Sequence, residues 1–180
     1  MFGLLLFFLA SGSVTSDTDI MAQVKSNKVL CSNPDEATKT CSAIASYILA
    51  KNGILTETAE ILISPDQPIT LEMSSVVSVD GAVNCGALTL PEMQKGRLRL
   101  NGRLLPPDRN EAALSRLLER LAPMAGRKSC EELRIKSGQL FKFGQVDRID
   151  LKLPEKPVKW VSLDEGFRVA PRQVPVAKAQ

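Results

Sequence analysis

Apolar segments separated by turn residues in the first half of the chain predict β-strands. Residues 42–50 and 54–64 are rich in apolar side chains, and the intervening Asn52-Gly53 is a strong signal for a hairpin turn. We therefore expect a strand, a turn and a second strand. A helix remains the alternative for residues 42–50, because alanine is common there.

The next segment alternates more regularly. In residues 69–73, apolar side chains fall on one face and polar side chains on the other, which predicts a half-buried strand. Ser74 and Ser75 interrupt this pattern before it resumes at residues 77–79, so we expect a β-bulge at the two serines. A short hairpin with a basic outer face is expected over residues 95–104. Further strands are expected over residues 132–136, 139–143, 146–152 and 158–163.

One amphipathic helix is predicted, over about residues 109–125. Asp108 and Glu111 have the spacing of a capping box, with aspartate in place of serine or threonine. Four leucines then recur at helical spacing and form one apolar stripe: Leu114, Leu117, Leu118 and Leu121. The expected fold class is α+β, a mainly antiparallel β-sheet with this helix packed on it.

The chain opens with an unbroken apolar run, residues 2–10, followed by small polar residues. This run is too short to cross a bilayer as a helix, which takes about 20 residues, and it matches the apolar region of a secretory signal peptide. We expect residues 1–16 to be a signal peptide, cleaved after Ser16 or after Gly12, although no basic residue precedes the run. A buried N-terminal strand or helix is the alternative. Cleavage would leave no transmembrane span.

Length and composition favour one folded domain. The 180 residues are 44% hydrophobic and 24% charged, which is typical of an ordinary globular protein. We expect a flexible N-terminal tail over residues 17–28, a single globular α+β domain over residues 29–168, and a loose C-terminal tail over residues 169–180.

The four cysteines predict two disulfides. Cys31, Cys41, Cys85 and Cys130 are even in number, and none belongs to a C-x-x-C motif, which argues against a zinc knuckle or a thioredoxin-type redox centre. Of three possible pairings we prefer Cys31–Cys41 with Cys85–Cys130, which would stabilise the fold by roughly 3 and 4 kcal/mol. The alternative is four reduced, buried cysteines. Disulfides and a signal peptide together indicate a periplasmic or secreted protein.

Residues for catalysis or cofactor binding are few. The chain contains no histidine, which excludes Ser-His-Asp and Cys-His triads and histidine metal ligands. It also lacks a P-loop, a dinucleotide-binding loop and a G-x-S-x-G motif, so we expect no cofactor and no metal. Two acidic pairs could serve a carboxylate-based hydrolase: Asp147 with Asp150, and Asp164 with Glu165.

Charge is unevenly distributed along the chain. Residues 17–94 carry four basic and ten acidic side chains, net −6, whereas residues 95–180 carry nineteen basic and ten acidic, net +9. The best organised candidates for anion binding lie on the expected basic hairpin: Lys95, Arg97, Arg99 and Arg103. A solvated strand face that pairs with acidic side chains is the alternative. The aromatic content of 4% and the expected export disfavour nucleic-acid binding.

These patterns predict an exported, disulfide-stabilised, non-catalytic protein of the cell envelope with a binding or structural role. Its partner would be another envelope protein or an anionic surface. Two alternatives stay open: a histidine-independent hydrolase that acts on envelope glycan through carboxylates, and an anionic-surface binder that uses the basic hairpin.

Overall fold

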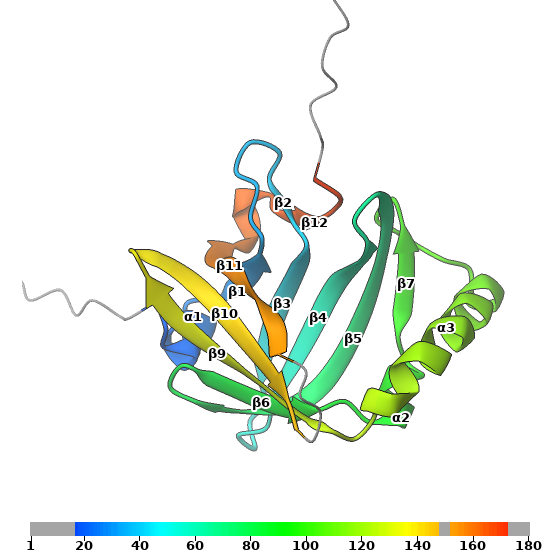
Figure 1. Cartoon of the computed structure of the whole chain (residues 1–180), viewed down its shortest axis with the longest axis horizontal. Helices are drawn as coiled ribbons and strands as arrows, with labels where there is room; N and C mark the ends of the chain where they lie inside the picture. Colours follow the sequence, from blue (N-terminus) through cyan, green and yellow to red (C-terminus); the bar gives the residue numbers. More distant parts are fainter. Residues whose placement is uncertain (1–16, 148–151, 173–180) are drawn as a thin grey trace, which may run out of the picture.

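Eight antiparallel strands form a closed β-barrel in the computed structural model, which describes residues 17–147 and 152–172 (Figure 1). The expected predominance of antiparallel strands is confirmed, but the sheet is not open, because the first barrel strand pairs with the last, Leu30 opposite Trp160. The barrel strands are β1 (Lys28–Ser32), β3 (Ala43–Leu49), β4 (Leu55–Ser64), β5 (Gln67–Asp80), β6 (Val83–Ala87), β9 (Lys128–Lys136), β10 (Gln139–Val146) and β11 (Lys152–Ser162). Each pairs with the next in this order.

The long strand β5 divides its partners between two elements. Its last residues, Val77–Asp80, pair with β6, whereas Ile69–Glu72 pair with β7 (Arg97–Leu100). β7 continues through a tight turn into β8 (Arg103–Leu104), and positive φ angles at Asn101 and Gly102, 52° and 74°, give that turn the twist of a hairpin. The sheet therefore extends beyond the barrel on one side.

The serines of β5 do not form the expected bulge. Thr58 pairs with Ser74 and Glu57 with Ser75 in unbroken register, so alternation continues through the two serines; the one register shift against β4 lies at Leu62–Ser64. The prediction was wrong because a polar residue on the inward face, Ser75, was taken for a break in the pattern. Ser75 instead marks a polar position on the inner surface of the barrel.

The expected amphipathic helix is α3 (Pro107–Leu121), followed by the 3₁₀ turn η1 (Ala122–Met124). It has no side-chain N-cap, so the predicted capping box is wrong. The side chain of Asn110 fixes the helix instead, because its Oδ1 accepts from the Leu98 N–H at 2.7 Å and its Nδ2 donates to the Gly96 carbonyl at 3.1 Å. α3 thus packs on the β5–β7 extension through a core of Leu71, Leu98 and Leu114. The short helix α2 (Leu90–Met93) precedes β7.

The segment expected as a flexible tail, residues 17–28, carries the helix α1 (Ile20–Lys25). Asp19 caps this helix by accepting from the Ala22 N–H at 3.0 Å, and Ile20 lies 2% exposed in the barrel core. The indole N–H of Trp160 donates to the Asp17 carbonyl at 2.8 Å. The composition of this segment is polar, but its one buried isoleucine and its capping aspartate order it.

Two disulfides link the chain as expected, Cys31 to Cys41 and Cys85 to Cys130. Cys85 and Cys130 lie directly opposite each other on β6 and β9, with their Cα atoms 4.1 Å apart. The other disulfide ties β1 to the short strand β2 (Thr40–Cys41), which pairs in parallel with β12 (Arg168–Val169). Between β11 and β12 lies the 3₁₀ turn η2 (Leu163–Glu165).

Some predictions fall outside the described residues: the signal peptide at residues 1–16, Asp150, and residues 173–180 of the expected C-terminal tail. In the described part, residues 17–147 and 152–172, no helix has the length and apolarity to span a membrane.

Candidate ligand-binding site

A cavity of about 170 Å³ lies inside the barrel, between the inner faces of four strands. Small or polar side chains make up much of its lining, whereas the interior of an eight-stranded barrel is just wide enough for larger side chains to fill. Val77 and Gly86, which pair across β5 and β6, form part of its wall. Its remaining lining residues are Glu57, Ala59, Met73, Ser75, Asn84, Leu88, Ser129 and Glu131.

The most buried polar residue of the cavity wall is Asn84, which is 5% exposed. Its Nδ2 donates to Glu57 Oε2 at 2.5 Å and, at the longer distance of 3.5 Å, to the hydroxyl of Tyr47. Its Oδ1 is buried and has no hydrogen-bond partner in the part of the chain that the structure describes. A buried acceptor without a donor costs free energy, so this oxygen is suited to receive a donor from a ligand.

An ion pair completes the polar cluster. Lys142 on β10 lies 2.8 Å from the Glu131 carboxylate on β9, and both side chains are mostly shielded from solvent. Burial, together with the negative charge of Glu131, raises the pKa of Glu57 against the opposing effects of Asn84 and Lys142. Burial and the same two glutamates raise the pKa of Tyr47 well above 10, which keeps its hydroxyl neutral.

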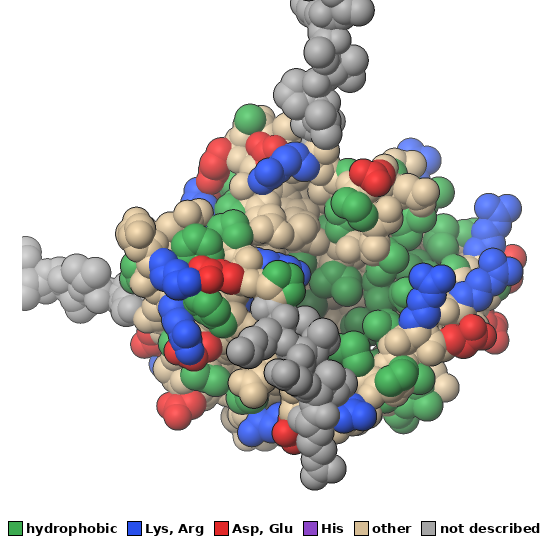
Figure 2. All heavy atoms as spheres, in the orientation of Figure 1, with side chains coloured by type: hydrophobic (Ala, Val, Ile, Leu, Met, Phe, Trp, Pro, Cys, Tyr) green, Lys and Arg blue, Asp and Glu red, His purple; other side chains and the backbone are tan. Residues whose placement is uncertain are grey.

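An apolar surface adjoins the polar cluster. Ala59 pairs with Met73, and Ile61 pairs with Leu71, two and four residues along β4 from Glu57 on the same face. Met73 and Ile61 pack against the leucine core beneath α3. Figure 2 shows hydrophobic side chains gathered in a hollow of the surface between β4–β5 and α3. The inner face of β4 and β5 is therefore polar at one end and apolar at the other.

No protein-family model matches this chain, and neither the curated proteins nor the solved structures contain a significant match to it. The assignment of a site therefore depends on geometry alone.

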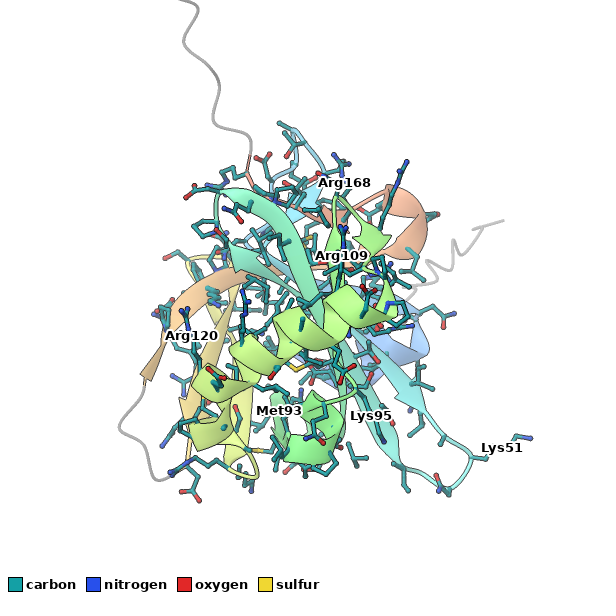
Figure 3. The ribbon with its side chains drawn as sticks, turned by 90° about the vertical axis from the view of Figure 1, so that its right-hand side faces the viewer. Lys51, Met93, Lys95, Arg109, Arg120 and Arg168 are labelled. Atoms are coloured by element: carbon teal, nitrogen blue, oxygen red, sulfur yellow. A yellow bond between two sulfur atoms is a disulfide. The ribbon has the colours of Figure 1, made fainter. Side chains whose placement is uncertain are left out.

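The basic residues expected to bind anions lie elsewhere. Arg97 forms an ion pair with Glu72 on the neighbouring strand β5, and Arg99 contacts the same carboxylate at 3.1 Å. Lys95 lies beside α2, on the face of the molecule that α3 covers (Figure 3), and Arg103 lies on β8 with its side chain exposed. Glu72 thus neutralises part of the hairpin's charge, and anion binding by the hairpin stays a prediction.

Asp147, Asp164 and Glu165, the described members of the acidic pairs expected for a hydrolase, do not line this cavity. Glu165 Oε1 accepts from the Ser162 N–H at 2.8 Å and so caps the turn η2, in which Asp164 also lies. Asp147 directly follows β10. In residues 17–147 and 152–172, no group of three or more cysteine or acidic side chains is arranged to hold a metal ion.

Sequence reasoning missed the polar cluster because its members are far apart in the chain and lie on five different strands. A local signal existed nevertheless. Glu57 stands on the otherwise apolar face of its strand, between Leu55 and Ala59, and Lys142 likewise follows Leu140 on the inward face of β10. A charged residue on the apolar face of an alternating strand indicates either a buried ion pair or a binding site.

Proposed function

We propose that the protein is exported and binds a small amphiphilic molecule inside its barrel without transforming it. The observation that carries this proposal is Asn84 in the wall of an interior cavity, with an Oδ1 that has no hydrogen-bond partner among the described residues. The change from polar to apolar side chains along β4 and β5 supports an amphiphilic ligand rather than a uniformly polar one.

Export is supported by two independent features. The two disulfides are typical of proteins from oxidising compartments, and the apolar run at residues 2–10 is typical of a signal peptide. The intact mass of the protein isolated from its own host, unreduced, tests this part. A mass that lacks 12 or 16 residues and four hydrogens is expected, and a full-length mass with four alkylated thiols would contradict export.

Binding is tested with a neutral fluorescent probe, N-phenyl-1-naphthylamine, which emits strongly in apolar surroundings. We expect saturable emission with one probe per protein. Ala59→Trp should abolish it, because the indole would fill the cavity beside Glu57. Thr58→Trp is the matched control, since Thr58 lies next in sequence and its side chain bonds Ser74 on the outer face.

Each outcome of that titration bears on the proposal. Saturable binding by the wild type and the Thr58 variant, with loss in the Ala59 variant, would support an interior site. Circular dichroism shows whether the Ala59 variant is folded, and Ala59→Leu provides a smaller obstruction if it is not. Equal binding by all three proteins, or no binding by the wild type, would contradict the proposal.

Carboxylate-based hydrolysis is a second candidate, now at different residues from those expected. Glu57 has the raised pKa that a general acid requires, and a second carboxylate, Glu131, lies near enough to contribute to that shift. Turnover of an envelope-glycan panel by the wild type, lost in Glu57→Gln, would favour this candidate. Absence of turnover in both proteins would favour binding alone.

A further inference from the structure

The polar end of the cavity presents hydrogen-bond acceptors. Asn84 Oδ1 is buried without a partner among the described residues, and Glu57 adds a carboxylate whose Oε2 is 2.5 Å from Asn84 Nδ2. The one cationic side chain of the cluster, Lys142, is already paired with Glu131. A ligand that satisfies this end of the cavity must therefore bring hydrogen-bond donors.

The formal charge of the cluster also favours a ligand that is cationic at this end. Glu57 and Glu131 together carry two negative charges when ionised, and Lys142 supplies one positive charge. Removing an uncompensated carboxylate from water is costly unless an opposite charge accompanies it. A cationic group beside Glu57 would bring the cluster to neutrality.

On the basis of the proposed binding function, we infer that the ligand is an amphiphilic primary amine. Its ammonium group would lie against the Glu57 carboxylate and, after a shift of the Asn84 side chain that opens its buried Oδ1 to the cavity, would also donate to that oxygen, so that its N–H donors meet at least two acceptors. Its apolar part would extend past Ala59 and Met73 toward Ile61, a path of about 13 Å along β4.

Other head groups match this end of the cavity less well. A carboxylate would add a third negative charge beside Glu57 and would supply no donor to Asn84 Oδ1. An alcohol could donate one hydrogen bond, but the charge of Glu57 would stay uncompensated. The head group therefore determines affinity, whereas the apolar part is shared by all three classes.

The test is displacement of bound N-phenyl-1-naphthylamine by three compounds with the same twelve-carbon chain: dodecylamine, dodecanol and dodecanoic acid. We expect half-displacement by the amine at a concentration at least about tenfold below that of the alcohol, with the acid weakest. Glu57→Gln should remove the preference for the amine, measured against the variant's own affinity for the probe. Glu60→Gln is the matched control, because Glu60 lies on the opposite face of β4, where it accepts from Thr70.

The pH dependence of amine binding to the wild type is an independent test of the inference. Burial and Glu131 raise the pKa of Glu57, opposed by Asn84 and Lys142, so Glu57 takes up its proton at a higher pH than an ordinary glutamate. Amine affinity should therefore fall as the pH is lowered through that value. Tyr47 stays neutral over this range, and dodecanol affinity should change much less.

The outcomes separate this inference from the proposed function. Equal displacement by the three compounds, or strongest displacement by the acid, would overturn the amine while leaving interior binding intact. An amine preference that survives in Glu57→Gln would also overturn it. If the probe does not bind the wild type, interior binding itself fails, and the amine inference fails with it.

Discussion

Asn84 Nδ2 donates to Glu57 Oε2 at 2.5 Å across the inside of the barrel, between two strands that are not neighbours in the sheet. β4 and β6 are separated by β5, so this hydrogen bond links side chains over the concave inner face. It places a carboxylate with a raised pKa beside a buried oxygen that lacks a partner in the described part of the chain. This combination distinguishes the interior from a packed apolar core.

Glu57→Gln should alter how stability depends on pH. Because the pKa of Glu57 is raised by folding, its favourable contribution is complete below the ordinary glutamate pKa of about 4.3 and is lost as the pH rises through the raised pKa. The neutral glutamine does not titrate. The melting temperature of Glu57→Gln minus that of the wild type should therefore be more positive at pH 8 than at pH 4.

Thermal unfolding of both proteins across this pH range is the measurement. The groups that face Glu57 are Glu131, Lys142, Tyr47 and Asn84, and they are present in both proteins. Their contributions therefore largely cancel in the difference. Parallel melting curves for the wild type and Glu57→Gln would show that Glu57 keeps its ordinary pKa in the folded state.

Replacing Cys85 and Cys130 together by alanine should lower the free energy of unfolding by about 4 kcal/mol, since the disulfide closes a loop with a sequence separation of 45. The barrel should persist, because Val83–Ala87 still pairs with Lys128–Glu132 along the strand ladder. Urea unfolding gives the free energy, and far-ultraviolet circular dichroism tests the fold. A loss of less than about 1 kcal/mol would mean that the unfolded chain gains little freedom when the disulfide is removed.

Leu114→Ala should destabilise the β5–β7 extension by about 2–5 kcal/mol. Leu114 is 4% exposed and packs against Leu71 and Leu98, so truncation leaves a cavity under α3. Leu104→Ala is the control, because Leu104 is 50% exposed at the end of the hairpin, where a change within about 0.5 kcal/mol is expected. Similar losses in both variants would argue against α3 as a packed part of the fold.

Ile20→Ala should loosen α1 from the barrel and lower stability by about 2–5 kcal/mol, because Ile20 is one of the most buried residues of the barrel core. Trp160, the only tryptophan, should then emit at longer wavelength, since its indole bonds the Asp17 carbonyl just before α1. Lys25→Ala, at an exposed position of the same helix, provides the comparison. An unchanged emission spectrum for Ile20→Ala would contradict this role of α1.

Local pattern was enough to predict most of the elements. The hairpin at Asn52-Gly53, the turn at Asn101-Gly102 and the leucine-striped helix depend on neighbouring residues, and the structure has all three. Prediction from local pattern failed where contacts with residues distant in the chain determine the local structure. The helix α1 forms in a polar segment because Ile20 is buried in the core, and Ser75 faces a cavity that no local window indicates.

The sequence by itself determined most of the strands, the turns, the amphipathic helix and the even number of cysteines, because each depends on alternation, backbone preference or composition over a few residues. It missed β1, and the strand expected over residues 146–152 is interrupted by a turn at Asp147. Only the tertiary structure decided that the strands close into a barrel, since Leu30 and Trp160 pair across 130 positions of the chain. The same closure gathers Tyr47, Glu57, Asn84, Glu131 and Lys142 from five strands. Such a cluster arises from the register of distant strands, which short-range alternation does not specify.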